Sequence, residues 1–215
     1  MIKILISAYN ESGNIAQAVR KFSEYGRVVV CDNESTDSTA AEASGAGAKV
    51  ITSKKGKGNS VRELLKEESD IYVLADGDGA FYAEDCERMI SLLKGGKADM
   101  VIGRRLNINT HTRGFNLLRK IILPLLIILF NMKHARDRRI NDFLCGFRAF
   151  TNEVKEKLDL KSKGFGIETE ITMQALKNNF NVVEIPIKVK PRRFGKQKAN
   201  PINVGFPALM NILFS

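Results

Sequence analysis

The 215-residue sequence has few of the residues that mark several large classes of protein. It contains no tryptophan, only four tyrosines and no motif of a known nucleic-acid-binding family, so we expect no nucleic-acid partner. Its three cysteines, Cys31, Cys86 and Cys145, lie far apart, in neither a zinc-binding pattern nor a disulfide framework. This sparse use of cysteine indicates a reducing, cytoplasmic environment.

The sequence also lacks a long apolar run. The apolar run at the start of the sequence ends within about seven residues, and a run of this length is too short for the apolar core of a signal peptide. No segment reaches the roughly 20 apolar residues that are needed to cross a bilayer. We therefore expect neither a secretory leader nor a transmembrane helix.

Acidic residues are too few to balance the basic ones. The chain has 34 Lys and Arg residues against 24 Asp and Glu residues, which gives a net charge of +10. An anionic membrane surface or a phosphorylated substrate would account for this excess, and solvated lysines on helix faces account for part of it. With 44% hydrophobic residues, the composition is that of a globular protein with a full core.

The first half of the sequence alternates continuous apolar segments with segments of helical periodicity. This pattern predicts an α/β fold with a mostly parallel sheet and helices on both faces. Ligands of such sheets bind beyond the carboxyl ends of the strands. The expected strands are 2–7, 28–31, 49–52, 71–75 and 100–102, and the expected helices are 14–22, 38–47, 61–66 and 84–93.

Two carboxylates, Asp76 and Asp78, follow the expected strand 71–75 directly. They offer hard oxygen ligands for Mg²⁺ or Mn²⁺, which proteins usually share with substrate phosphates. The glycine between them allows a diphosphate to approach the backbone closely. An EF-hand loop is excluded, because Ala80 and Phe81 stand where a ligand and an obligatory glycine are required. A plain Asp-Gly turn remains the alternative.

Polar residues also follow two neighbouring strands. The segment Asp32–Asp37 supplies acceptors suited to a ribose or a base, and it also suits the cap of the following helix. The segment Lys54–Gly58 places flexible cations where they could meet phosphate. It fits neither a P-loop nor a dinucleotide fingerprint, so on its own it predicts only a basic turn.

The second half contains a mainly apolar segment, Phe115–Met132, whose only charged residues are Arg119 and Lys120. We expect an amphipathic helix near 113–135 that lies in a membrane interface, with its cations near anionic headgroups. A buried core helix kinked at Pro124 is the alternative. A second apolar stretch, 204–214, could dock beside it. The basic residues on both sides are Arg113, Arg119 and Lys120, then Lys133, Arg136, Arg138 and Arg139.

Sequence blocks of one kind follow each other along nearly the whole chain. The first-half blocks are Ala8–Glu11, Val30–Asn33 with Ser35 and Asp37, Gly56–Gly58 and Asp76–Gly79. The second-half blocks are Ile102–Arg105, Asn141–Phe150, Gly164–Glu170, Glu184–Ile187 and Arg193–Lys198. The first set resembles the inverting family 2 glycosyltransferases of GT-A fold. The second set is similar to the dolichyl-phosphate mannose and glucose synthases.

The resemblance implies a role for each matching position. The metal, Mg²⁺ or Mn²⁺, would be held by Asp76 and Asp78. The lipid phosphate would be held by Arg105 and Arg119. Asp142 and Asp78 would act at the reacting centre, although a polar turn also explains Asp142. The nucleotide sugar would be held by Ala8, Tyr9, Glu11, Asp32, Lys57, Asp76, Arg193 and Lys198.

Four positions depart from the family pattern. Ala8 stands for the usual Pro, Asn33 for a second Asp, Ala80 for a Gln seen in some metal sites, and Gln197 for a Ser. Without Gln at position 80 the cation has fewer protein ligands, so water or the diphosphate must complete its coordination.

The resemblance implies transfer of mannose or glucose from a GDP- or UDP-sugar to a polyprenyl phosphate, with inversion. Residues 1–105 would bind the nucleotide sugar, and residues 106–215 would bind the acceptor. The protein would lie peripherally on the cytoplasmic face of a membrane. Two alternatives remain open: a polysaccharide or protein acceptor, and a non-catalytic membrane module with a degenerate nucleotide pocket.

Overall fold

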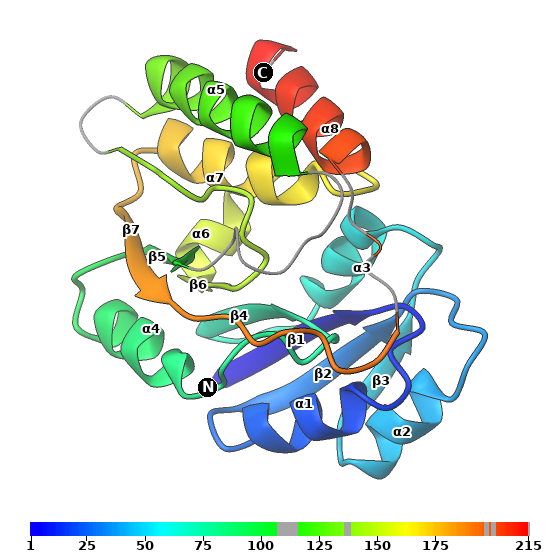
Figure 1. Ribbon diagram of the computed structural model, residues 1–215. Helices are drawn as coiled ribbons and strands as arrows, with labels where there is room; N and C mark the ends of the chain where they lie inside the picture. Colours follow the sequence, from blue (N-terminus) through cyan, green and yellow to red (C-terminus); the bar gives the residue numbers. More distant parts are fainter. Residues whose placement is uncertain (107–115, 136–138, 196–197, 199–200, 215) are drawn as a thin grey trace.

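A seven-stranded mixed sheet forms the centre of the protein, with strand order β3-β2-β1-β4-β6-β5-β7 (Figure 1). The structure, a computed structural model, describes residues 1–106, 116–135, 139–195, 198 and 201–214. The strands are β1 Ile2–Ala8, β2 Arg27–Asp32, β3 Lys49–Thr52, β4 Ile71–Asp76, β5 Met100–Arg105, β6 Arg148–Thr151 and β7 Val182–Ile187. The helices are α1 Ile15–Phe22, α2 Thr39–Gly45, α3 Lys57–Leu64, α4 Asp85–Lys94, α5 Asn116–His134, α6 Asn152–Glu156, α7 Ile167–Lys177 and α8 Pro201–Phe214.

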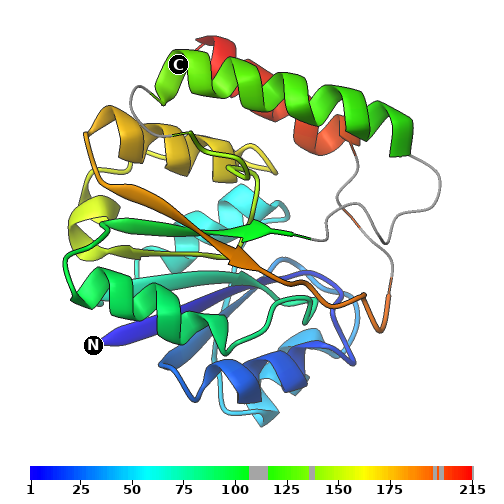
Figure 2. The same cartoon turned by 60° about the vertical axis from the view of Figure 1, so that its left-hand side comes forward.

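The first four strands form the parallel part of the sheet. Strand β1 pairs in parallel with β2 and β4, and β2 pairs in parallel with β3. The β1 residues Ile4, Leu5 and Ile6 are completely buried, as a strand covered on both faces requires. Helices α1, α2 and α4 lie on one face, and α3 and α7 lie on the other (Figures 1 and 2). The α/β fold predicted from the sequence is confirmed.

Two details differ from the sequence prediction. Strand β6 runs antiparallel between β4 and β5, so the sheet is mixed at this side. The helix expected at 61–66 begins earlier, at Lys57, directly after Gly56. Gly56 has φ of 127°, a conformation that favours glycine, and this turn brings Lys57 into the first helical turn.

Helices α5 and α8 pack against each other beyond α7, which confirms the expectation that the two apolar stretches dock together (Figure 2). Helix α5 is buried on one side only: Phe130 stacks on Phe143 with ring centroids 4.2 Å apart, whereas Leu125, Ile128 and Met132 are 54%, 50% and 80% exposed. The buried-core alternative therefore does not describe α5, and its place in a membrane interface stays a prediction. Arg113, Arg136 and Arg138 lie outside the described residues, as do the side chains of Arg119 and Lys120.

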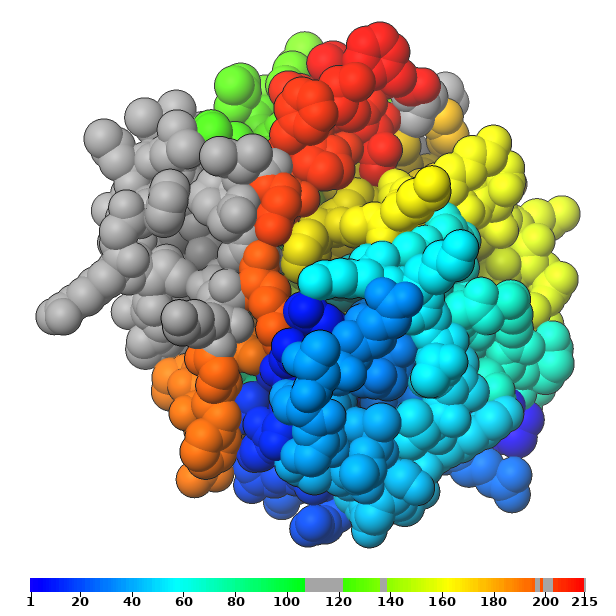
Figure 3. Space-filling view, turned by 90° about the vertical axis from the view of Figure 1, so that its right-hand side faces the viewer, coloured from blue at the N-terminus to red at the C-terminus, as the bar shows by residue number. Residues whose placement is uncertain are grey.

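Within the described part of the chain, no helix combines the length and apolar character that a membrane span requires. Helices α8 and α5 form one end of the molecule, and α1 and α2 form the opposite end (Figure 3).

Candidate active site

The carboxyl ends of the parallel strands bring the predicted nucleotide-site residues to one edge of the sheet. Ala8 is in register with Asp32 of β2, and the preceding residue, Ser7, is in register with Asp76 of β4. Ala8 is buried, and its carbonyl accepts a hydrogen bond from the Asn33 amide at 2.9 Å. A Cβ atom on Gly77 would lie 3.0 Å from the Ala8 side chain, so the two loops pack closely at this edge.

Lys57 is held at the end of β4 by two carboxylates. Its Nζ lies 2.6 Å from Asp76 Oδ1 and 2.5 Å from Glu168 Oε1. Burial alone lowers the pKa of Lys57, but the two carboxylates outweigh it and raise the pKa above its usual value. Lys57 is therefore part of an ion cluster with two carboxylates, and its contact with the nucleotide sugar stays a prediction. Glu168, from the first turn of α7, lies in the Gly164–Glu170 block, but no role was predicted for it.

Asp78 completes the predicted metal pair. Its Oδ1 accepts the Ala80 amide at 3.0 Å, and its Oδ2 lies 3.4 Å from Arg192 Nη1. Burial, together with the charge of Asp76, raises the pKa of Asp78. Among the residues that the structure describes, no group of three His, Cys, Asp or Glu side chains could enclose a metal ion. The two carboxylates fit a cation that takes its other ligands from water and a substrate diphosphate, as Mg²⁺ commonly does.

Glu11 is buried beneath two cations that come from the segment after β7. Lys198 Nζ lies 2.6 Å from Glu11 Oε1, and Arg192 Nη2 pairs with Glu11 Oε2. Lys198 also donates to the backbone carbonyls of Tyr9 and Asn10. Residues far apart in the chain thus close over the ends of β1 and β4.

The structure distinguishes the two neighbouring arginines of this segment. Arg192 bridges Glu11 and Asp78, although the sequence prediction did not name it. Arg193, which was predicted to meet donor phosphates, lies beside α1 with its Nη1 3.4 Å from Gln17 Oε1. The role of Arg193 stays a prediction, and no pattern in the sequence separates these two adjacent cations.

Tyr9 and Asp32 lie at the carboxyl ends of β1 and β2. Lys55 Nζ donates to the Tyr9 hydroxyl at 2.8 Å and lies 4.4 Å from the centre of the Tyr9 ring. Asp32 Oδ2 accepts the Ser35 amide at 3.1 Å. Asp32 Oδ1 is buried and has no hydrogen-bond partner among the described residues. A buried acceptor of this kind suits an N–H or O–H donor of a ligand.

A second charged cluster joins Arg105 and Asp142. Arg105 Nε and Nη2 donate to Asp142 Oδ2 and Oδ1 at 2.8 and 2.7 Å, and the Arg105 amide donates to the same carboxylate at 3.1 Å. Glu184 of β7 accepts the Asn141 and Asp142 amides at 2.9 and 2.7 Å. The structure therefore brings together Arg105 and Asp142, which were both predicted site residues. It adds Glu184, for which the sequence contained one indication, its place in the Glu184–Ile187 block.

The segment 142–148 connects the two clusters. A Cβ atom on Gly146 would lie 2.8 Å from both Asp76 Oδ2 and Lys57 Nζ, so a larger residue would force these side chains to shift. Arg148 is fully buried and donates to the carbonyls of Phe143, Cys145 and Glu168. Arg148 thus links the turn that contains Asp142 to helix α7, which contains Glu168.

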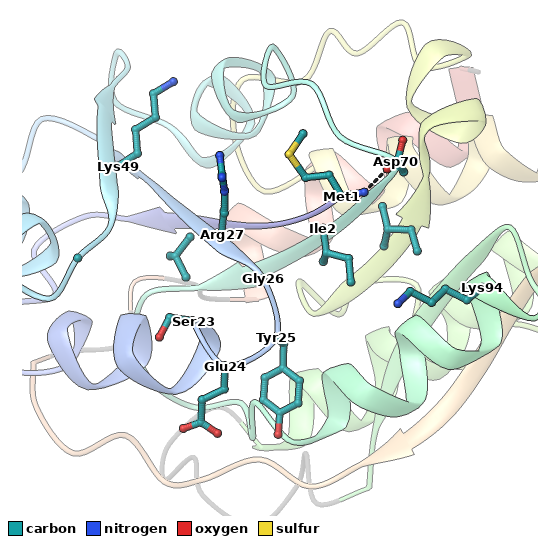
Figure 4. Close-up of a pocket in the computed structure, with 13 residues that line it drawn as sticks. Met1, Ile2, Ser23, Glu24, Tyr25, Gly26, Arg27, Lys49, Asp70 and Lys94 are labelled. Atoms are coloured by element: carbon teal, nitrogen blue, oxygen red, sulfur yellow. Dashed lines mark hydrogen bonds and ion pairs between the residues drawn. The ribbon is translucent and has the colours of Figure 1, made fainter.

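A large groove lies elsewhere on the described surface. It has a volume of about 980 Å³ and lies at the amino ends of the strands, where the Met1 amino group pairs with Asp70 (Figure 4). Exposed Arg27 and Lys94 lie around it, but none of the predicted site residues lines it. Ligands of parallel sheets bind at the opposite, carboxyl ends, so we exclude this groove as the active site.

Comparisons with known proteins identify the family of the chain. The family model described as glycosyl transferase family 2 matches residues 3–159. Glycosyltransferase AglJ of Haloferax volcanii is 34% identical over 208 residues, which cover 94% of this chain and 67% of that protein. Polyprenol monophosphomannose synthase of Mycolicibacterium smegmatis is 28% identical over 219 residues, which cover 94% of this chain and 82% of that protein.

A solved structure shares the fold. Glucosyl-3-phosphoglycerate synthase from Mycobacterium tuberculosis, in complex with Mn²⁺, UDP-glucose and phosphoglyceric acid, superposes with a TM-score of 0.78 at 19% identity. The superposition covers 99% of this chain and 78% of that chain, which identifies the fold as GT-A. Because the family model spans most of the sequence, and a relative more than 30% identical covers nearly all of it, this glycosyltransferase belongs to glycosyl transferase family 2.

Proposed function

We propose that the protein transfers mannose or glucose from a GDP- or UDP-sugar to a polyprenyl phosphate, with inversion at the anomeric carbon. The observation that carries the proposal is the pair of charged clusters joined through Gly146. Asp76 and Asp78 belong to one cluster, and Arg105 and Asp142 belong to the other. One cluster suits a donor diphosphate with its cation, and the other suits an anionic acceptor. In this proposal residues 1–105 bind the donor, and residues 106–215 bind the acceptor.

The donor would lie along the ends of β1, β2 and β4. The free Asp32 Oδ1 would accept an N–H of the base or a ribose hydroxyl, and Tyr9 and Glu11 would line the same pocket. A Mg²⁺ or Mn²⁺ ion held by Asp76 and Asp78 would stabilise the negative charge that develops on the departing diphosphate.

The acceptor phosphate would bind to the face of Arg105 that Asp142 leaves free. A guanidinium carries five N–H donors, and the Asp142 carboxylate takes two of them. A phosphate monoester is already anionic near neutral pH, so it needs orientation more than deprotonation. Asp142 would orient Arg105, and the phosphate oxygen would then attack from the face opposite the leaving diphosphate. Arg119 of α5 would be a second cation for this phosphate.

The exposed apolar face of α5 and α8 supports a membrane-bound acceptor. Leu125, Ile128 and Met132 of α5 are accompanied by Phe206 and Phe214 of α8, which are 62% and 77% exposed. Five large apolar side chains on two packed helices are typical of an interfacial surface. The similarity to a polyprenol monophosphomannose synthase points to the same class of acceptor.

The test is a transfer assay with radiolabelled GDP-mannose, GDP-glucose and UDP-glucose, with polyprenyl phosphate in anionic vesicles. We expect a labelled product that is extracted into organic solvent and that forms only with Mg²⁺ or Mn²⁺. A parallel reaction with free phosphoglyceric acid tests a water-soluble acceptor. Label that appears only in that reaction, or in neither, would overturn the proposal.

A further inference from the structure

The cluster around Lys57 contains a carboxylate that the donor site does not require. Lys57 belongs to α3, Asp76 to β4 and Glu168 to α7, and the lysine lies between the two acids at 2.6 and 2.5 Å. A donor diphosphate and a divalent cation would reach Asp76, but Glu168 lies on the far side of the lysine. Its side chain is only 6% exposed.

We infer that Glu168 is a positioning residue that sets the affinity of the site for the divalent cation, acting through Lys57 on Asp76. This inference rests on the proposed function, which assigns the cation to Asp76 and Asp78. Glu168 itself is not a ligand of the cation in this assignment.

The charges of the cluster determine the direction of the effect. One ammonium group between two carboxylates leaves the cluster with one negative charge, which adds to the charge of Asp78. Without the Glu168 charge, Lys57 would neutralise Asp76 alone, and the site would attract a cation less strongly. Because Lys57 pairs with both Glu168 and Asp76, its charge neutralises Asp76 only in part. The carboxylate of Asp76 therefore keeps its attraction for a cation.

Close packing restricts the movement of the Lys57 side chain. Its side chain is 16% exposed, and the turn at Gly146 lies so near that an added Cβ atom would be 2.8 Å from both Lys57 Nζ and Asp76 Oδ2. The remaining space beside the ammonium is a cavity of about 10 Å³, which has room for a single water molecule. Lys57 consequently acts on Asp76 rather than as a mobile contact to the donor phosphates.

Glu168 is itself firmly held. It lies in the first turn of α7, where the helix dipole favours a negative charge. Its backbone carbonyl accepts hydrogen bonds from Arg148 Nη1 at 2.9 Å and from the Thr172 hydroxyl at 2.9 Å. A fixed carboxylate on a rigid helix is suited to orient its neighbour.

The test is a titration of the purified full chain with Mn²⁺ alone and with saturating UDP or GDP, with free Mn²⁺ measured by electron paramagnetic resonance. We expect Glu168→Gln to bind Mn²⁺ about tenfold more weakly, the scale at which partners of metal ligands commonly act. Lys57→Met should act in the opposite direction and bind Mn²⁺ more tightly. Glu63→Gln is the matched control, because it removes the same charge from an exposed site on α3 and should leave Mn²⁺ affinity unchanged.

The outcomes separate the inference from the proposed function. If the unaltered protein binds no Mn²⁺, with or without nucleotide, both fail. If it binds Mn²⁺ and Glu168→Gln binds with the same affinity, only the inference fails. A lower melting temperature of Glu168→Gln without a change in Mn²⁺ affinity would show a merely structural role and would also overturn it. Glu168→Gln decides the question even if Lys57→Met does not fold.

Discussion

Arg105 and Asp142 form a two-point ion pair, with N–O distances of 2.8 and 2.7 Å, at the end of β5. The carboxylate is largely buried, and Glu184 holds the backbone on its amino side through two amide hydrogen bonds. The guanidinium of Arg105 and the carboxylate of Asp142 are therefore held in a fixed orientation relative to each other. Such a pair restricts the direction in which the remaining N–H groups of Arg105 point.

Arg105→Lys should lower kcat about 100-fold, because a single ammonium cannot reproduce the fork that fixes both groups, and small misplacements at a reacting centre have effects of this size. Binding of UDP or GDP should not change, because the donor cluster is separate. The measurements are steady-state transfer kinetics and nucleotide titration calorimetry. Arg104→Lys is the matched control, and an equal loss of activity in that variant would contradict the prediction.

Gly146→Ala should disrupt the site without any change of charge. The new Cβ atom would lie 2.8 Å from Asp76 Oδ2 and Lys57 Nζ, so the ion cluster must shift. We expect a destabilisation of about 1 to 3 kcal/mol, typical of overpacking, together with weaker Mn²⁺ binding. Denaturant unfolding and Mn²⁺ titration measure the two effects.

Gly164→Ala serves as the control for that substitution. Nothing lies within 4 Å of the Cβ atom that it would add. We expect unfolding and Mn²⁺ binding close to those of the unaltered protein. If Gly146→Ala and Gly164→Ala have the same free energy of unfolding and the same Mn²⁺ affinity, the close contact at Gly146 is important for neither.

Arg192→Gln should weaken nucleotide binding more than Arg193→Gln does. Arg192 pairs with Glu11 and Asp78, whereas Arg193 contacts only the neutral Gln17 among the described residues. A nucleoside diphosphate is anionic, and charge-assisted hydrogen bonds are worth about 1.5 to 3 kcal/mol, so we expect at least a tenfold loss of UDP or GDP affinity for Arg192→Gln. Calorimetry on both variants provides the comparison, and a larger loss for Arg193→Gln would reverse the assignment.

Much of the donor site could be predicted from the sequence, because apolar periodicity specifies parallel strands whose carboxyl ends share one edge. Asp32, Asp76 and the residues after β1 came together for this reason. The partners of Lys57 could not be predicted. Glu168 approaches it only through the packing of α7 on α3, which depends on tertiary contacts rather than on local spacing.

The same limit applies to the shorter elements. Strand β6 has four residues, too few for periodicity to reveal its antiparallel pairing between β4 and β5. Adjacent residues on an irregular segment, such as Arg192 and Arg193, have no period that assigns them to opposite sides. The contacts of such residues are decided by the tertiary fold.

Acid should selectively remove the contribution of Glu67 to stability. Hydrogen bonds from Lys3 and Lys49, at 2.7 and 2.6 Å, lower the pKa of this carboxyl group in the folded state. A depressed folded-state pKa gives stability that is present above the unfolded value of 4.5 and is lost as the pH falls through the folded value. Glu67→Gln should therefore be less stable by about 1 kcal/mol at pH 7, and the difference should shrink below pH 4.5.

Urea unfolding of the two proteins at a series of pH values measures this difference. Lys66 pairs with Glu63 on the exposed face of α3, so Glu63→Gln is the control for a surface ion pair. Its effect on the free energy of unfolding should be small at every pH. A difference for Glu67→Gln that stays constant from pH 7 to acid would contradict the assignment of the pKa shift.

Ile128→Glu should weaken binding to anionic vesicles while leaving the catalytic site intact. Ile128 is 50% exposed on the face of α5 that also carries Leu125 and Met132. Loss of one inserted apolar side chain removes about 1.5 to 3 kcal/mol, which corresponds to a decrease in vesicle affinity of at least tenfold. Vesicle co-sedimentation measures the binding, and transfer to a short, water-soluble polyprenyl phosphate measures the site. Because the substitution lies on the outer side of the helix, transfer to the soluble acceptor should persist. Loss of both activities together would place Ile128 in the catalytic fold rather than at a membrane surface, and unchanged sedimentation would exclude this face as the site of membrane binding.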